Sequence, residues 1–338
     1  MENPFLGKYG PLLIAEIGGN HEGNFEYARK LTKLAIDSGA DFVKFQIYTG
    51  DTLVSSIESP DRNAHFKKFE LTPKQHVELA KMVTDAGVQY MASVWDLSAL
   101  DWIDEFLPIY KIGSGDLTAY PILREFAKRE KPIILSTGLA TTQEIMEAVS
   151  VIQSENPVYK DKRKLALLQC TSMYPINPED ANLNVMYELR QKTGLTIGYS
   201  DHTEGCKALY YAVAMGAEIL EFHFTDTREG KQFRDHKVSL TSEEVKQLIA
   251  EIELIRKYQG VYKKQPTAVE LANKHEVSFR RAVYPARDIA AGELLTTNNL
   301  TVLRPNHGID AREFDNVLGK KSKVSLKKHQ KLDWDMFE

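Results

Sequence analysis

The strongest constraint on this chain is a repeated alternation between short apolar runs and longer segments with helical spacing. The segments 24–38, 72–86, 142–153 and 204–215 place apolar residues three and four positions apart, as helices that pack on a sheet do. Eight strands joined by crossover helices predict a (β/α)8 barrel, or TIM barrel. The eight apolar runs begin at Pro11, Phe42, Gln89, Ile109, Pro132, Lys164, Leu195 and Glu218.

The length of the chain indicates a second, smaller domain after the barrel. A chain of 338 residues exceeds the size at which single cores usually stop growing. Thr241 and Glu244 form a capping box at the start of a closing helix over 241–258, so the barrel is predicted to cover residues 1–260. Residues 261–278 are polar and irregular and predict a linker. Short strand-like pieces with turn signals predict a β-rich domain over 279–338.

Composition excludes several classes of function. The net charge of −4 provides no basic field for nucleic acid or an anionic membrane. Cys170 and Cys206 are too few for a disulfide framework and lack the spacing of a zinc or redox motif, which favours a reducing cytoplasm. The apolar run over 11–17 is typical of a strand rather than a secretion leader, and no stretch approaches the roughly 20 apolar residues of a membrane span.

Polar residues recur two apart near the ends of the predicted strands. Because alternate side chains point to opposite faces, one set must face the barrel interior. Buried lysines and carboxylates need an explanation: either a structural ion pair such as Glu16 with Lys44, or a small ligand that carries carboxylate and phosphate. The residues assigned to the interior are Glu16, Lys44, Gln46, Lys111, Ser136, Gln169, Thr171, Ser200, His202, Glu221 and His223.

His202 and His223 form a candidate metal pair, because they end neighbouring predicted strands on the inward face. Taken singly, a histidine is more often a satisfied core residue or a surface proton carrier than a metal ligand. As a pair they suit manganese or a related divalent ion with coordination positions left for water and substrate oxygen. Asp201 and Asp235 are candidate supporting carboxylates, and His21 and His236 lie beside the same motifs.

The chain resembles the sialic acid synthases, a family that includes neuraminic, legionaminic and pseudaminic acid synthases and a spore-coat polysaccharide relative. The tail VYPARDIAAGELLTTNNLTVLRPNHGI, from Val283, is similar to the antifreeze-like (SAF) domain at the C-terminus of these synthases. The resemblance covers nearly the whole chain in the same order. The other matching stretches are AEIGGNHEGN, GADFVKFQ, YKIGSGD, KPIILSTG, LLQCTSMYP, GYSDHTEG, ILEFHFT and DHKVSL.

The resemblance implies a transferase that joins phosphoenolpyruvate to an N-acetylmannosamine-type aldehyde, giving a sialic-acid-like nonulosonic acid and phosphate. His202 and His223 would hold manganese, with magnesium or cobalt as alternatives, to polarise the aldehyde, and Glu16 would act as acid or base. Arg304 would reach the acceptor from the partner in a domain-swapped homodimer. Phosphoenolpyruvate would be bound by Lys44, Lys111, Ser114, Ser136, Ser172 and Ser200, with Ser93 near them, and the acceptor by Gln46, Tyr174 and Asp235.

Four positions depart from the family's usual pattern. Ser93-Val94-Trp95 replaces Thr-Pro-Phe, and Gln169 replaces a histidine. Phe222 replaces a basic residue but is expected to point outward, and Phe233-Arg234 replaces Gly-Pro in the loop that covers the sugar. These changes leave the reaction class intact and the acceptor open. The alternatives are a phosphoenolpyruvate- or pyruvate-dependent aldolase or synthase for another aldose, and an inactive carbohydrate-binding relative.

Overall fold

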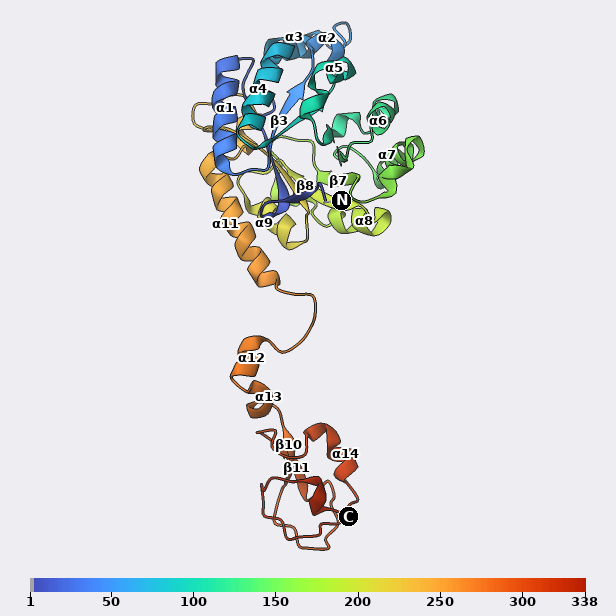
Figure 1. The fold of residues 1–338 in the computed structure, drawn as a ribbon, viewed down its shortest axis with the longest axis vertical. Coiled ribbons are helices and arrows are strands. Elements are labelled where there is room, and N and C mark those ends of the chain that lie inside the picture. The colour runs from blue at the N-terminus through green and yellow to red at the C-terminus, as the bar shows by residue number, and fades with distance from the viewer. Residues whose placement is uncertain (1–2) are drawn as a thin grey trace. The chain divides into compact units, whose positions relative to one another are not determined.

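A computed structural model describes residues 3–338, which divide after Gly260 into two compact units. In the first unit eight parallel strands close into a barrel, because the first of them pairs with both the second and the last (Figure 1). A short strand, β1 (Leu6–Gly7), pairs antiparallel with β2. The predicted (β/α)8 barrel is confirmed. Its strands are β2 (Gly10–Glu16), β3 (Phe42–Ile47), β4 (Gln89–Val94), β5 (Tyr110–Ile112), β6 (Ile133–Ser136), β7 (Leu165–Cys170), β8 (Thr196–Asp201) and β9 (Ile219–His223).

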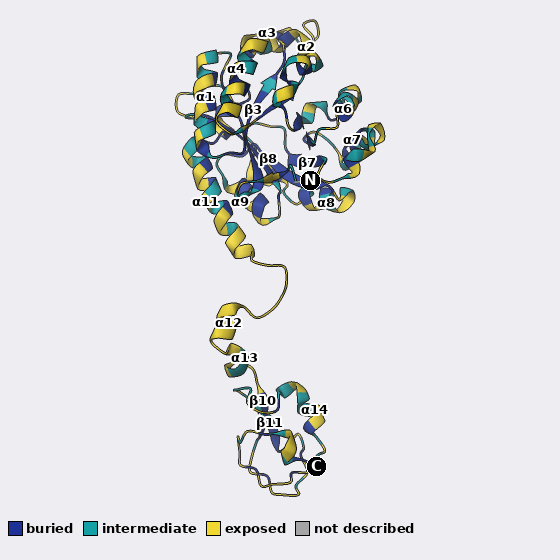
Figure 2. Ribbon diagram, viewed as in Figure 1, coloured by how far each residue is buried: buried dark blue, intermediate teal, exposed yellow. Residues whose placement is uncertain are grey.

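Helices surround the barrel with apolar faces toward the strands and exposed faces outward (Figure 2). The predicted capping box is present: the Glu244 carboxylate accepts from the Thr241 N–H at 2.8 Å, and the Thr241 hydroxyl accepts from the Glu244 N–H at 3.4 Å. Three short helices lie in loops: α2 (Gly50–Leu53), α3 (Pro60–Phe69) and α10 (Asp235–Val238). The others are α1 (Phe25–Ser38), α4 (Pro73–Asp85), α5 (Leu100–Ile103), α6 (Tyr120–Ala127), α7 (Thr142–Glu155), α8 (Val185–Thr193), α9 (Lys207–Ala214) and α11 (Ser242–Gln259).

Strand alternation divides the apolar residues of the barrel into two cores. The outer core lies between strands and helices and contains Phe45 and, as expected, Phe222. The inner core fills the barrel itself and includes Ile14, Met91 and Ile219. Each of these inner residues is followed two positions later by a polar one, so the inner core forms a dry floor beneath the polar strand ends.

The second unit differs from its prediction, because it contains helices in the expected linker and one two-stranded sheet in the expected β-rich domain. The segment 261–278, expected to be irregular, contains α12 (Ala268–Ala272) and α13 (His275–Ser278). A capping box between Thr267 and Glu270, which the sequence analysis overlooked, starts α12. One two-stranded antiparallel sheet, β10 (Ala282–Pro285) and β11 (Leu300–Leu303), is supplemented by isolated bridges and by α14 (Phe314–Val317). Its core includes Val283, Ile289, Leu300, Val317 and Leu332.

Within residues 3–338, no helix is both long enough and apolar enough to cross a membrane.

Burial of His76 should make the stability of the barrel depend on pH. Its side chain, on α4, packs at 6.4 Å from the Phe45 ring centre, and its Nδ1 has no hydrogen-bond partner among the described residues. Burial lowers the pKa of His76 to about 3. Below the ordinary value of about 6.5, the unfolded chain takes up a proton that the folded protein does not. The free energy of unfolding should therefore fall as the pH drops from 6.5 toward 3.

We expect His76→Met to reduce this slope, since it fills the site without a titrating group. Urea unfolding between pH 6.5 and 4.5 measures the pH slope of the free energy of unfolding. The slope of the unaltered protein should exceed that of the variant by a value that approaches about 1.4 kcal/mol per pH unit. Other buried histidines also have lowered pKa values, so part of the slope should remain in the variant. His307→Asn, on an exposed side chain of the second unit, is the control. An unchanged slope in His76→Met would contradict the assignment.

Candidate active site

A cavity of about 1170 Å³ opens at the carboxyl ends of the barrel strands. The active sites of TIM barrels form at this end, where the loops after each strand converge. Arg304 belongs to the other unit, where its guanidinium carbon lies 5.2 Å from the centre of the Phe279 ring; its role and the homodimer stay predictions. The other predicted site residues all line the cavity: Glu16, Lys44, Gln46, Ser93, Lys111, Ser114, Ser136, Ser172, Tyr174, Ser200, His202, His223 and Asp235.

The strand register brings these residues to a common level. Glu16 on β2 stands beside Lys44 on β3 and beside His223 on β9. On the other side of β9, Ser200 on β8 stands beside Glu221. Every second residue of a strand faces the barrel interior, and paired positions on adjacent strands lie side by side. The inward polar residues of several strands therefore form a ring above the inner core.

Two lysines and two carboxylates form a buried charge cluster at the base of the cavity. The Lys44 ammonium lies 2.8 Å from Glu16 Oε2 and 3.5 Å from Glu221 Oε2. The Lys111 ammonium lies 3.5 Å from Glu221 Oε1 and donates a hydrogen bond to Ser136 Oγ at 2.7 Å. The predicted Glu16–Lys44 ion pair is therefore present, and Glu221 links it to Lys111.

The two lysines differ electrostatically because their carboxylate neighbours differ. Burial alone would lower the pKa of Lys44, but Glu16 and Glu221 together outweigh it and raise that pKa. Burial lowers the pKa of Lys111, whose ammonium lies 3.5 Å from Glu221. Although burial opposes ionisation of Glu221, the two ammonium groups lower its pKa to about 2. Glu221 is therefore ionised at neutral pH and counterbalances both lysines.

The two histidines lie together at the edge of this cluster, with ring centres 5.3 Å apart. His202 Nδ1 is 2.6 Å from the Thr171 carbonyl oxygen, which can only accept, so the proton is on Nδ1 and the Nε2 lone pair is free. His223 Nδ1 has no hydrogen-bond partner among the described residues and lies 3.9 Å from Asp235 Oδ2. Burial lowers the pKa of each imidazole to about 4.

These features fit a divalent metal, because neutral imidazoles with free lone pairs are metal ligands. Residues 3–338 contain no group of three or more histidine, cysteine, aspartate or glutamate side chains placed to hold an ion. A metal here would thus have the two imidazoles as its protein nitrogen ligands, and its remaining positions would be filled by water or substrate.

Tyr174 and Asp235 close the cavity beside the histidines. The Tyr174 ring centre lies 4.0 Å from that of His202, and burial raises the pKa of its phenol, which stays protonated. Burial also raises the pKa of Asp235. Arg234 contacts both: its guanidinium carbon is 4.8 Å from the Tyr174 ring centre, and its Nε is 3.3 Å from Asp235 Oδ1.

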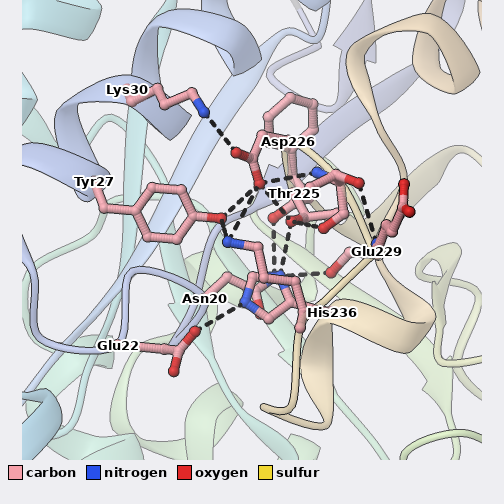
Figure 3. Close-up of polar contacts among 12 residues, drawn as sticks. Asn20, Glu22, Tyr27, Lys30, Thr225, Asp226, Glu229 and His236 are labelled. Carbon is pink, nitrogen blue, oxygen red and sulfur yellow. Dashed lines mark hydrogen bonds and ion pairs between the residues drawn. The ribbon is translucent and has the colours of Figure 1, made fainter.

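The β9–α11 loop (residues 224–241), which carries Asp235, is anchored to the start of the barrel by a polar network (Figure 3). The Tyr27 hydroxyl donates to Asp226 Oδ1 at 2.5 Å, and Lys30 Nζ donates to Asp226 Oδ2 at 2.7 Å. The amide of Asn20 donates to the Phe224 carbonyl at 2.9 Å. These contacts fix the base of the loop from α1 and from the turn after β2.

Two of the predicted interior positions are wrong. Gln169 donates to the Ala181 carbonyl at 3.1 Å and Thr171 to the Asp180 carbonyl at 2.7 Å, so both turn away from the barrel interior. Leu168 belongs to the inner core, which means that the alternate positions Cys170 and Ser172 face the cavity. Gln169 and Thr171 were assigned to the interior because they are polar, but the inward residues of β7 are apolar until the strand ends.

Other side chains considered in the sequence fall outside the cavity lining. Asp201 accepts hydrogen bonds from the Tyr199 hydroxyl at 3.0 Å and from the Thr203 N–H at 2.9 Å, so it holds a turn. His21 accepts from the Gly23 N–H at 3.1 Å, and His236 Nδ1 is 2.7 Å from Thr225 Oγ1. These contacts satisfy the three side chains locally.

Sequence reasoning missed the importance of Glu221 and of several aromatic rings in the cavity wall. Glu221 was placed on the inward face but was given no role in the site, although it stands two residues before His223. The available signal was its inward parity, two positions before His223, on a barrel that also carries the inward lysines Lys44 and Lys111.

Together, the closed barrel and the charged cavity at its carboxyl end define a protein of the TIM-barrel class, in which active sites form at the ends of the strands. Residues 31–264 match the NeuB family and residues 280–338 match the SAF domain. The chain belongs to the NeuB family, and the resemblance to sialic acid synthases is confirmed.

Relatives with named activities align over most of the chain. The N,N'-diacetyllegionaminic acid synthase of Campylobacter jejuni is 36% identical over 322 residues, which are 91% of this chain and 95% of that protein. The human N-acetylneuraminate-9-phosphate synthase is 30% identical and aligns with 95% of this chain and 90% of its own length. The N-acetylneuraminic acid synthetase of Leptospira borgpetersenii, solved in complex with citrate, is 33% identical with a TM-score of 0.72 over 78% of this chain and 90% of its own.

Proposed function

We propose that this protein is a nonulosonic acid synthase that condenses phosphoenolpyruvate with an uncyclised amino-sugar aldehyde and releases phosphate. The observation that carries the proposal is the buried cluster of Lys44, Lys111, Glu16 and Glu221 next to the His202–His223 pair. The activities of the Campylobacter and human relatives support the reaction type.

Lys44 and Lys111 would bind the carboxylate and phosphate of phosphoenolpyruvate. Serine hydroxyls surround them: Ser136 already accepts from Lys111 at 2.7 Å, and Ser200 donates to Glu221 at 3.0 Å. Ser114 accepts from the Gly138 N–H at 3.0 Å, and an added Cβ at Gly138 would collide with Ser172. Glycine at 138 therefore keeps these hydroxyls clear for a bound anion, as charge-assisted hydrogen bonding to phosphate requires.

His202 and His223 would hold the divalent metal, for which we propose Mn²⁺. When bound, such an ion supplies Lewis-acid polarisation of a substrate oxygen. The protein's own contribution is to keep both imidazoles neutral by burial and to fix the orientation of His202 through the Thr171 carbonyl.

In the proposed reaction, C3 of phosphoenolpyruvate forms the new bond to the aldehyde carbon. Water adds at C2, the bond between C2 and the bridging oxygen breaks, and phosphate leaves with one proton of that water while C2 becomes a ketone. The aldehyde oxygen gains a proton and becomes a hydroxyl. Glu16 is the candidate proton carrier, because its carboxylate lies in the cavity and is oriented by Lys44 at 2.8 Å and by the Gln46 amide at 2.8 Å.

The proposal predicts phosphate release that requires both phosphoenolpyruvate and an amino-sugar aldehyde. The measurement is a phosphate assay with Mn²⁺ and with N-acetylmannosamine, its 6-phosphate or a 2,4-diacetamido hexose as acceptor. Pyruvate in place of phosphoenolpyruvate should give no nonulosonic acid, which separates the synthase from an aldolase. Absence of release with every acceptor, or equal release without an acceptor, would contradict the proposed function.

A further inference from the structure

Six aromatic rings form a continuous surface on one side of the cavity, which we call the aromatic wall. It consists of Tyr48, His65, Phe66, Phe69, Trp95 and Phe233, and all six line the cavity. Ring centres are 5.4 Å apart between Trp95 and Tyr48, and 5.2 Å apart between Tyr48 and Phe66. These distances fall in the range at which aromatic pairs attract each other.

The second half of the aromatic wall leads to the β9–α11 loop. The ring centres of His65 and Phe69 are 4.4 Å apart, and those of Phe69 and Phe233 are 5.0 Å apart. Phe233 lies against the backbone of Gly19, where an added Cβ would come within 3.1 Å of its ring. The wall thus joins residues after β3 and β4 to the loop after β9, and it reaches within two residues of Asp235.

Packing of the barrel does not account for the wall. None of its six side chains belongs to the outer or inner core. Phe66, Trp95 and Phe233 are only partly buried, and His65 is exposed. Its supporting loop is tied down by Asn63, whose amide donates to the carbonyls of Gly50 at 2.9 Å and Val54 at 2.8 Å. A large apolar surface held rigid at a cavity suits a ligand.

The cations that line the cavity are either paired with a carboxylate or exposed. Lys44 and Lys111 belong to the charge cluster, and Arg234 pairs with Asp235 at 3.3 Å. Arg62 is exposed and lies 5.9 Å from the centre of the Phe66 ring. A phosphate group on the acceptor would lose its hydrating water beside the aromatic rings. Without a buried cation to compensate for that water, its desolvation would cost free energy.

We propose that the aromatic wall is the acceptor-specificity surface of this protein, that it binds an uncharged, acylated face of the amino sugar, and that Phe233 determines which substituents fit. The inference rests on the proposed synthase function and adds the acceptor class to it. Apolar C–H faces and acyl methyl groups gain by contact with ring faces, whereas a phosphate does not.

Kinetics with a panel of acceptors tests the proposal. The 2,4-diacetamido hexose and N-acetylmannosamine should each exceed N-acetylmannosamine 6-phosphate in kcat/KM by about tenfold or more, the range that apolar pockets achieve. Phe233→Ala should raise the acceptor KM about tenfold and leave the phosphoenolpyruvate KM within about twofold. Phe233→Tyr, which retains the ring, should behave like the unaltered protein. Preference for the 6-phosphate, or equal shifts in both KM values, would overturn the proposal.

Tryptophan fluorescence provides a readout that does not depend on turnover. Trp95 lies in the wall, whereas Trp102 packs near His76 and Trp334 belongs to the second unit. Titration with the 2,4-diacetamido hexose should give a saturable change that Trp95→Phe removes and Phe233→Ala shifts to higher concentration. No change in the unaltered protein overturns the wall as a binding surface. Fluorescence binding without phosphate release would instead reject the synthase function while keeping the wall.

Discussion

His223→Ala is expected to reduce Mn²⁺-dependent phosphate release at least about a thousandfold, which corresponds to about 4 kcal/mol of barrier. The variant loses one of two imidazoles whose ring centres are 5.3 Å apart, and the described residues offer no third histidine, cysteine or carboxylate in a metal-binding arrangement to compensate. Because the remaining His202 would be a single protein nitrogen ligand, Mn²⁺ affinity should fall together with turnover. Electron paramagnetic resonance of free Mn²⁺ measures that affinity directly.

His76→Met is the matched control for this experiment. It also removes a buried histidine, but one that packs outside the barrel against Phe45 and Trp102. Mn²⁺ affinity and turnover at pH 7.5 should be unchanged in this control. If His223→Ala matched the control in Mn²⁺ affinity and turnover, the assignment of His223 as a metal ligand would be contradicted. The charge cluster would still support anion binding in that case.

The barrel could be predicted because its signal is periodic and repeated. An apolar run such as 11–17, followed by a helical segment such as 24–38, identifies one strand–helix unit from local sequence alone. Eight such units in a row are compatible with few architectures other than a closed barrel. The inward positions of Lys44, His202 and His223 followed from the same alternation, since each is preceded two residues earlier by a residue that also faces inward.

The errors arose where polarity was used in place of register. Gln169 and Thr171 are polar, but inner-core Leu168 fixes the opposite parity for β7, and Ser172, a site residue in the resemblance, shares that parity. The two indications conflicted within the sequence itself. Parity fixed by the apolar residues would have been the better guide, because a slip of one residue exchanges every side chain between the two faces.

The aromatic wall could not be read from spacing. Its rings come from the loop after β3, from α3, from the end of β4 and from the β9–α11 loop, and irregular segments have no fixed period. Phe233 was noticed only as a departure from a family pattern. Its contact with Phe69, 164 positions earlier in the chain, depends on closure of the barrel between β9 and β2.

Glu221→Gln is expected to destabilise the protein by about 3–5 kcal/mol, the usual result of removing one partner from a buried ion pair. The amide oxygen of the new side chain could still accept from Ser200, but the charge that faces both lysines would be lost. Lys44 keeps Glu16 at 2.8 Å, whereas Lys111 keeps two uncharged acceptors, the Ser136 hydroxyl and the Ile112 carbonyl. Urea unfolding at pH 7.5 measures the loss of stability.

The same substitution should shift the pH dependence of phosphoenolpyruvate binding to lower pH. Burial already lowers the pKa of Lys111, and Glu221 partly offsets this, so its removal lowers that pKa further. As the pH rises, Lys111 in the variant loses its proton earlier than in the unaltered protein. The KM for phosphoenolpyruvate should therefore begin to rise at a lower pH, as measured by phosphate release between pH 6 and 9.

A double variant separates charge balance from a general disruption of the barrel. Lys111→Met combined with Glu221→Gln removes both charges, so most of the lost unfolding free energy should return even though phosphoenolpyruvate binding does not. If the double variant is as unstable as Glu221→Gln, the destabilisation comes from packing around β9 rather than from an unpaired ammonium. If Glu221→Gln changes neither stability nor the pH profile of KM, Glu221 does not hold the two lysines in their charged, anion-binding state.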